Sequence, residues 1–314
     1  MRISMTIAVC CTAIAGAIPT SGMSKPIKSD AQQYTDAQIL NFALGLEHFQ
    51  DSFYRSALAN WTEAQFAEAG FNADFYTNLT AVAAQQHTHV TSLTKTLTQL
   101  NVTPVEECVY NFNGTSPRVF VQDASLIEAV SVSSYITLLV NLSGSAYQRL
   151  FASVLAVEAR HASFIRAALG EQPFPSPYDT PLDLDEANTL VQLFVVSCPQ
   201  PNPLALKNFP TLSSSYSNRG AVGNEVTFVT YGQDIKAGSD STPLFAAFLT
   251  LTGPVFAPTK RLPNNGGFNA TVPAAPEGFA PISGTTYVVL STSDSCLNDD
   301  IIVAGPASIE IFPK

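Results

Sequence analysis

The feature that most constrains this fold is a pair of polar side chains, Glu158 and His161, inside the otherwise apolar stretch AVEARHASF of residues 156–164. Residues three apart lie on the same face of a helix. A carboxylate buried without a partner is strongly unfavourable, so an inward-facing pair needs other polar groups opposite it. The pair is therefore either a surface feature or one part of a site that several helices build together.

Apolar residues recur every three or four positions from about Thr35 to Leu169, which is the pattern of amphipathic helices. The segment between residues 101 and 118 contains two prolines and is expected to be a long loop. Two helical hairpins joined by a long connection are typical of a four-helix bundle with one crossover. The expected bundle helices cover residues 35–59, 72–100, 122–142 and 144–169.

Each expected bundle helix carries polar residues on its inward stripe. A Glu from each of two helices, with a Glu-x-x-His pair from each of the other two, is the ligand set of di-iron or di-manganese carboxylate proteins. Here the corresponding residues, in chain order, are Glu47, Gln86 with His89, Glu128, and Glu158 with His161.

Position 86 departs from that set, because a glutamine stands where the pattern has a glutamate. An amide cannot bridge two cations as a carboxylate does, and it removes one negative charge from the site. The pattern thus predicts one bound metal, or two bound weakly. The alternative is a metal-free relic in which Arg149 or Arg160 and tyrosines neutralise the carboxylates.

Other polar residues near these stripes are assigned different roles. His48 and His87 lie off the stripe and are expected at the surface or behind the ligands, and Gln50 is expected outside the ligand set. Tyr54, Tyr135 and Tyr147 fall near inward faces, where core packing with a hydrogen-bonded hydroxyl is the common role.

Three segments, LNFALGLEHFQDSFYRSAL, QHTHVTSL and AVEARHASFIR, resemble the ferritin-like domain of secreted fungal stress-response proteins, which are related to plant desiccation-related proteins. CVYNF and VVSCPQPNP are similar to the segments that flank this domain, and the resemblance covers residues 35–205. It implies a ferritin-like fold and an association with stress or desiccation. The metal ligands that it implies fall on Glu47, position 86, His89, Glu128, Glu158 and His161.

The N-terminus has the pattern of a secretory signal. Arg2 precedes an apolar run that ends in the small residues Ala15-Gly16-Ala17, so residues 1–17 are interpreted as a cleaved signal peptide. An uncleaved anchor is the alternative, and no second segment is expected to span a membrane. Six N-x-S/T sequons favour a secreted glycoprotein of the extracellular space or cell wall. They lie at Asn60, Asn78, Asn101, Asn113, Asn141 and Asn269.

The cysteines are consistent with secretion. Without the signal, Cys108, Cys198 and Cys296 remain, and an oxidising compartment favours one disulfide among them. Cys108 and Cys198 lie in segments that flank the helical region, so these two are expected to pair. Three free thiols are the alternative, and the state of Cys296 stays open.

The composition changes after Cys198, where a proline-rich linker leads into a region with strand patterning. The expected domains are a bundle over residues 30–200, which a short helix over 183–196 completes, and a β-rich domain over 201–314. The second domain is predicted to form a small antiparallel sheet or sandwich that acts as a structural cap or binds a cell-wall or extracellular partner. Its expected strands cover residues 225–231, 244–251, 285–290 and 301–311.

Charge and missing motifs exclude several functions. The formal net charge of −10 argues against nucleic acid or an anionic membrane as a partner. The chain lacks the GxSxG, P-loop, GxGxxG and HExxH motifs.

Two functional hypotheses remain, and the oligomeric state is open in both. One is a secreted protein that binds iron or manganese and, if an enzyme, acts as a metal-dependent oxidoreductase on oxygen or peroxide. The other is a non-enzymatic extracellular structural or stress protein.

Overall fold

The computed structural model of the 314-residue chain describes residues 34–112, 114–199, 204–214, 220–230, 235, 242–263 and 266–312. The chain divides into two compact units, one ending at Phe209 and the other beginning at Pro210. Each unit is described by itself. The predicted signal peptide and the sequon at Asn113 lie outside the described residues.

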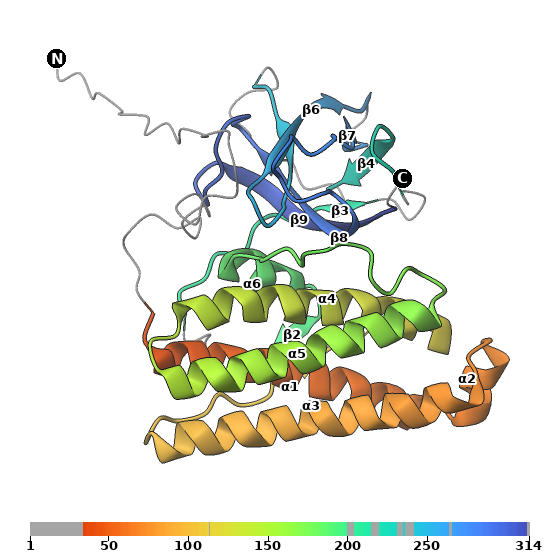
Figure 1. Ribbon diagram of the computed structural model, residues 1–314, viewed down its shortest axis with the longest axis vertical. Coiled ribbons are helices and arrows are strands. Elements are labelled where there is room, and N and C mark those ends of the chain that lie inside the picture. Colours follow the sequence, from red (N-terminus) through yellow and green to blue (C-terminus); the bar gives the residue numbers. More distant parts are fainter. Residues whose placement is uncertain are drawn as a thin grey trace. The chain divides into compact units, whose positions relative to one another are not determined.

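The first unit is built on four long helices that run side by side (Figure 1). α1 packs along α3 and α4 packs along α5, and a long connection leads from the first pair to the second. This arrangement confirms the predicted four-helix bundle with one long crossover. The helices of this unit are α1 (Asp36–Asn60), α2 (Glu63–Glu68), α3 (Ala73–Gln99), α4 (Pro117–Asn141), α5 (Ser145–Ala168) and α6 (Leu184–Gln192).

The helix boundaries follow capping residues in the sequence. Thr35 forms a capping box with Gln38 at the start of α1, and Ser116 caps α4 by accepting a hydrogen bond from the Val119 N–H. The prediction that α4 begins at residue 122 was wrong, because Pro117 occupies the first turn instead of the loop. Proline is favoured there, since the N–H that it lacks would have no helical partner.

The sequence patterns missed two short features of this unit. A second capping box, formed by Thr62 and Gln65, starts the short helix α2. The predicted helix over 183–196 ends at Gln192, because the chain continues into β2 (Val195–Ser197), which pairs with β1 (Val109–Tyr110). The two-stranded ribbon lies beside the disulfide between Cys108 and Cys198.

The bundle has two hydrophobic clusters, one toward each end. The aliphatic cluster includes Leu40, Leu44 and Leu97, and the aromatic cluster contains Phe53 and Phe120, whose rings stack with centroids 4.6 Å apart. On each of the four long helices, the buried residues before the middle belong to one cluster and those after the middle belong to the other. The polar residues of the predicted site lie in the interval between the two clusters.

Among the described helices, α4 is long and apolar enough to cross a membrane, although no second spanning segment was expected from the sequence. In this structure 56% of its most apolar window is buried inside the protein. The buried residues of α4, such as Val121 and Leu138, belong to the aromatic and aliphatic clusters. The composition of α4 is therefore that of a bundle core helix.

The second unit is a seven-stranded antiparallel sheet with the order β3-β4-β7-β6-β5-β8-β9. Its edge strands approach each other, because the Ser214 hydroxyl donates to the Ser308 carbonyl oxygen at 2.8 Å and Gly220 bridges to Ile311. The sheet therefore curls around its own apolar core. Its strands are β3 (Ser213–Ser214), β4 (Glu225–Val229), β5 (Phe245–Phe248), β6 (Val255–Arg261), β7 (Phe268–Thr271), β8 (Gly284–Ser291) and β9 (Ile302–Ile311).

The four predicted strands correspond to β4, β5, β8 and β9, which confirms the β-rich antiparallel C-terminal part. The sequence patterns missed β3, β6 and β7. Pro258 lies within β6, and proline in a short run argues against a strand, since it cannot donate to a neighbouring strand. Here Pro258 pairs opposite Phe245 and the strand continues past it.

Candidate metal centre

The structure brings all six predicted site residues together at the middle of the bundle. Glu47, Gln86, Glu128 and Glu158 have no solvent exposure, and His161 is 5% exposed. Each of the four long helices contributes: α1 supplies Glu47, α3 supplies Gln86 and His89, α4 supplies Glu128, and α5 supplies Glu158 and His161. Helical spacing and the family resemblance predicted that these residues share the interior of the bundle, and whether they bind a metal stays a prediction.

The carboxylates and histidines form two overlapping groups. The first, which we call the His89 half-site, contains Glu47, His89 and Glu158. The second, the His161 half-site, contains Glu128, Glu158 and His161. In each, one ligand atom per residue lies within 4.8 Å of the others, and Glu158 belongs to both.

Both histidines present Nδ1 to the carboxylates. His89 Nδ1 lies 3.3 Å from Glu47 Oε2 and 3.2 Å from Glu158 Oε1. His161 Nδ1 lies 3.6 Å from Glu128 Oε2 and 4.0 Å from Glu158 Oε1. Glu158 Oε1 is therefore the carboxylate oxygen that lies within 4.0 Å of both histidine Nδ1 atoms.

Three buried carboxylate oxygens at this centre have no hydrogen-bond partner among the described residues: Glu47 Oε2, Glu128 Oε2 and Glu158 Oε1. The other oxygens of two of these groups are occupied, because the Tyr135 hydroxyl donates to Glu47 Oε1 and the Tyr54 hydroxyl donates to Glu128 Oε1. Each tyrosine thus orients a carboxylate, whose remaining oxygen faces a histidine.

Gln86 takes part in a chain of side-chain amides. Its Nε2 donates to Gln50 Oε1 and to Glu158 Oε2, both at 3.2 Å, and its Oε1 lies 3.2 Å from His89 Nδ1. Gln50 in turn donates to the Ser131 hydroxyl at 3.0 Å. Gln50 contributes no ligand atom to either half-site. It instead accepts a hydrogen bond from Gln86, the residue that departs from the expected ligand set. Ser131 has no distinguishing sequence signal and was missed.

The shifted pKa values show how the buried carboxylates and histidines of the centre affect one another's charge. Burial lowers the pKa of His89, but the Glu158 and Glu47 carboxylates facing its Nδ1 outweigh burial and raise that pKa to about 10. Burial and the nearby charge of Glu158 raise the pKa of Glu128 to about 7 and raise the pKa of Glu47. Imidazolium–carboxylate pairs therefore offset part of the buried negative charge.

The pKa of Glu158 shifts in the opposite direction. Burial alone would raise it, but the close contact with His89 and the charges of His161 and His89 lower it. Glu158 thus remains the most acidic of the three carboxyl groups, as suits a ligand shared by two half-sites.

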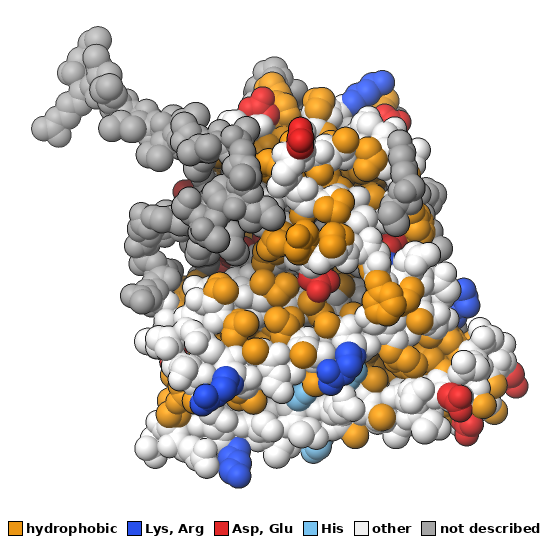
Figure 2. Space-filling view, viewed as in Figure 1, with side chains coloured by type: hydrophobic (Ala, Val, Ile, Leu, Met, Phe, Trp, Pro, Cys, Tyr) orange, Lys and Arg blue, Asp and Glu red, His pale blue; other side chains and the backbone are white. Residues whose placement is uncertain are grey.

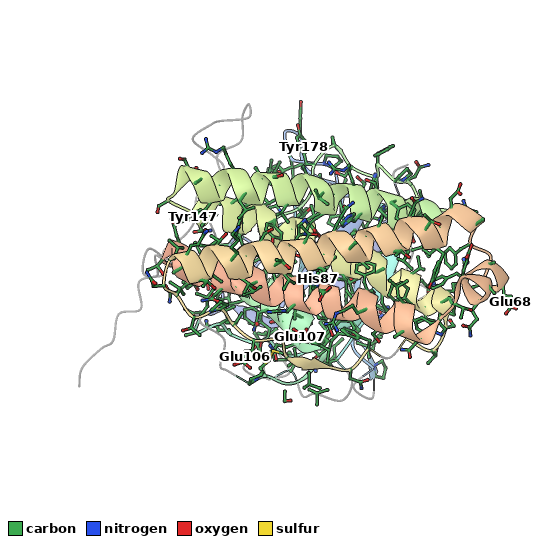
Figure 3. The ribbon with its side chains drawn as sticks, turned by 90° about the horizontal axis from the view of Figure 1, so that it is seen from below. Glu68, His87, Glu106, Glu107, Tyr147 and Tyr178 are labelled. Atoms are coloured by element: carbon green, nitrogen blue, oxygen red, sulfur yellow. A yellow bond between two sulfur atoms is a disulfide. The ribbon has the colours of Figure 1, made fainter. Side chains whose placement is uncertain are left out.

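The predicted arginine partners do not reach the carboxylates. Arg149 and Arg160 are exposed on α5, so that part of the relic hypothesis was wrong. The tyrosines supply the neutral donors instead. His48 and His87 also lie away from the centre: His48 Nε2 is 3.2 Å from the Val105 carbonyl oxygen, and His87 lies at the surface of α3 (Figure 3).

The predicted disulfide is present. Cys108 in the crossover connection is joined to Cys198 after α6, across a sequence separation of 90 residues. A stable disulfide indicates an oxidising compartment. Cys296 is a free, half-buried cysteine of the second unit. Glycosylation stays a prediction: Asn60, Asn78 and Asn101 are exposed, and Asn141 and Asn269 are partly buried.

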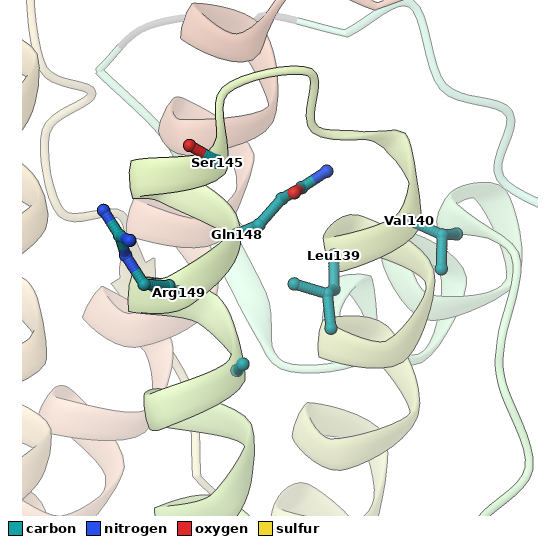
Figure 4. Close-up of a pocket in the computed structure, with 6 residues that line it drawn as sticks. Leu139, Val140, Ser145, Gln148 and Arg149 are labelled. Atoms are coloured by element: carbon teal, nitrogen blue, oxygen red, sulfur yellow. The ribbon is translucent and has the colours of Figure 1, made fainter.

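A surface depression lies apart from the centre, between the C-terminal part of α4 and the N-terminal part of α5 (Figure 4). Leu139, Val140, Ser145, Gln148, Arg149 and Ala152 line it. It contains none of the site residues and has mainly apolar walls. The depression is therefore separate from the metal site predicted from the sequence.

The residues present suit a transition-metal ion. Carboxylate oxygens and imidazole nitrogens are ligands that iron and manganese accept, and the three oxygens without a hydrogen bond each face a histidine Nδ1. Two divalent ions carry more charge than three carboxylates offset, and Gln86 presents its NH₂ group to the shared Glu158. The donor set therefore fits one metal ion well and a second ion poorly.

Comparisons with known proteins agree with this architecture. Residues 35–171 match the family model described as a ferritin-like domain. The chain is also similar to Protein rds1 of Schizosaccharomyces pombe, with 24% identity over 315 aligned residues. That alignment covers 87% of this chain and 77% of the yeast protein, so the similarity extends beyond the bundle into the β-rich part.

Proposed function

We propose that this chain, whose residues 35–171 match a ferritin-like domain, binds iron or manganese inside the bundle. The observation that carries the proposal is the set of three buried carboxylate oxygens without hydrogen-bond partners, Glu47 Oε2, Glu128 Oε2 and Glu158 Oε1. Leaving such atoms unsatisfied is costly, and a cation in either half-site would satisfy two of them, Glu158 Oε1 included.

The chain's own residues would perform distinct tasks at this centre. An ion would be held either by Glu47, His89 and Glu158 or by Glu128, Glu158 and His161, and Tyr54 and Tyr135 orient two of the carboxylates. The aliphatic and aromatic clusters above and below keep bulk water out. Bound iron or manganese would supply one-electron chemistry toward oxygen or peroxide, which would make the protein a metal-dependent oxidoreductase.

The proposal includes a secreted location. The disulfide supports an oxidising compartment, and the signal-like N-terminus and the sequons favour an extracellular or cell-wall glycoprotein. A role under stress or desiccation is part of the same proposal and rests on the sequence resemblance. The β-rich unit is proposed to contact a cell-wall or extracellular partner.

The second candidate is a metal-free structural protein. The observation that favours it is that each histidine Nδ1 already lies 3.2–3.6 Å from a carboxylate oxygen, with the pKa of both rings raised. Two protonated imidazoles would then offset the negative charge of the buried carboxylates, as the metal ion does in the first candidate. The bundle would serve as a scaffold without chemistry of its own.

Metal analysis of the purified protein separates the two candidates. The protein is expressed with added iron or manganese, dialysed, and measured for metal per chain. The first candidate predicts about one ion per wild-type chain and a loss of most of it in Glu158→Gln, because Glu158 belongs to both half-sites.

Glu68→Gln serves as the matched control, because Glu68 is an exposed glutamate at the end of α2 in the same bundle (Figure 3). Its metal content should equal that of the wild type. A wild-type protein that takes up neither ion, aerobically or anaerobically, would exclude the metal-binding function and leave the scaffold.

A further inference from the structure

The two histidines of the centre are held differently at the nitrogen that faces away from the carboxylates. His161 Nε2 lies 2.8 Å from Gln85 Oε1. For His89, the described contacts all involve Nδ1. The exposed fraction of the His89 side chain is 11%, against 6% for that of His161. The His161 ring is thus held from two sides and the His89 ring from one.

The chemistry of imidazole fixes the direction of the Gln85 contact. A ring that coordinates a metal through Nδ1 must have its lone pair there, so its proton is on Nε2. His161 Nδ1 faces the Gln86 amide nitrogen at 3.5 Å as well as Glu128 and Glu158, and Nε2 donates its N–H to Gln85 Oε1, which can only accept. A metal-bound histidine usually has such an acceptor for its other nitrogen, and the acceptor fixes the ring's orientation.

Gln85 comes from a different helix than the ring that it contacts. It directly precedes the buried Gln86 on α3, and it is an exposed residue that reaches across to His161 on α5. In the space-filling view, histidine atoms are visible at the surface of the helical unit, one group of them beside a Lys or Arg side chain (Figure 2). Gln85 therefore lies on the solvent side of the His161 ring.

We propose that Gln85 is a positioning residue that holds His161 with Nδ1 toward Glu128 and Glu158, and that the His161 half-site consequently fills before the His89 half-site. This inference rests on the proposed metal-binding function. It assigns to an exposed glutamine on α3 the role of making the two half-sites unequal in affinity.

The first test needs no metal. The chain has four histidines, so protein labelled with ¹⁵N-histidine gives few ring N–H signals. The His161 Nε2–H should exchange slowly with solvent in the wild type and in Gln99→Leu, which changes another exposed glutamine of α3. It should exchange at least several-fold faster in Gln85→Leu, because the acceptor is gone. An unchanged exchange rate in Gln85→Leu would overturn the positioning role.

The second test uses Co²⁺ alone as the probe, followed by its visible absorption. Loss of a hydrogen-bond acceptor behind a metal-bound histidine weakens metal affinity roughly 10–100-fold, so Gln85→Leu should bind its first Co²⁺ weaker by this factor. Gln85→Glu keeps an acceptor and should bind at least as tightly as the wild type, with Gln99→Leu unchanged. Equal first-ion affinity in Gln85→Leu and the wild type would overturn the order of filling.

The two tests separate this inference from the proposed function. If the wild type binds no metal, the proposed function and the order of filling both fail, and the exchange rate alone decides whether Gln85 holds the His161 ring. If the wild type binds metal and Gln85→Leu behaves like it in both tests, the proposed function stands and the inference about Gln85 is wrong.

Discussion

At the residue scale, we expect position 86 to limit how many cations the proposed metal centre can hold. A glutamate there would add a negative charge and a second carboxylate shared by both half-sites, whereas Gln86 donates its amide N–H to Glu158. The amide chain through Gln50 to Ser131 further orients Gln86 in this way. The side chains around Gln86 therefore form hydrogen bonds that suit an amide at this position.

The change Gln86→Glu should raise the metal content from about one to about two ions per chain. The added carboxylate offsets the charge of a second ion and can bridge it to the first. Metal analysis and Co²⁺ titration measure this outcome. Gln99→Glu, which adds the same charge at an exposed position of α3, should leave the metal content unchanged. A Gln86→Glu protein with one ion or none would show that charge at position 86 does not limit the site.

The buried tyrosines should matter for stability even without metal. In Tyr135→Phe, Glu47 Oε1 loses its donor inside a fully buried site, and an unsatisfied buried group costs about 1–3 kcal/mol. The free energy of unfolding, measured by urea denaturation of the metal-free protein, should fall by that amount. Tyr147→Phe, at a half-buried position outside the centre, should change it little. Equal losses in both variants would argue against the special role of the Tyr135 hydroxyl.

At the scale of elements, helix ends and the crossover connection set the positions of the four long helices. Capping residues define where α1, α3 and α4 begin, and these starts fix which residues reach the middle of the bundle. The crossover connection between α3 and α4 carries Cys108, which is joined to Cys198 beyond α6. The disulfide therefore links the middle of the unit to its end.

Removing this disulfide should destabilise the helical unit considerably. Closing a loop of this size in the unfolded chain corresponds to about 4–5 kcal/mol in the chain-entropy model, and measured losses for native disulfides are about 2–5 kcal/mol. The double variant Cys108→Ser, Cys198→Ser should therefore unfold at a clearly lower urea concentration. Cys296→Ser removes the free cysteine and is the control. A double variant as stable as the wild type would mean that the crossover is held by packing alone.

At the scale of the whole molecule, the chain has two compact units, each with its own apolar core. All residues of the candidate metal centre and both cysteines of the disulfide belong to the first unit. The proposed metal site therefore takes its candidate ligands from the helical unit alone, as far as the described residues extend. The β-rich unit instead offers a separate curled sheet, which we propose as the part that contacts an extracellular partner.

Residues 30–209 expressed alone should fold and keep the metal site, since their two hydrophobic clusters are complete within this range. Circular dichroism should show a helical protein with one cooperative thermal transition, and its metal content per chain should match that of the full chain. An unfolded or metal-free fragment, from a full chain that binds metal, would show that the β-rich unit supports the bundle.

The sequence by itself determined the bundle and most of its centre. Helical periodicity placed Glu47, Gln86, His89, Glu128, Glu158 and His161 on inward faces, because side chains three and four apart share a face whatever the surroundings. The position of the disulfide also followed from the chain, since Cys108 and Cys198 flank the helices. These features depend on local spacing, which a single sequence contains.

Only the tertiary structure decided what those residues contact. The donors to Glu47 and Glu128 are tyrosines instead of the arginines of α5, and Gln85, Gln50 and Ser131 support the site from other helices. The strands β6 and β7 became visible only through their pairing partners. Such contacts depend on the rotation and register of one element against another, which packing of the whole core determines and local spacing does not.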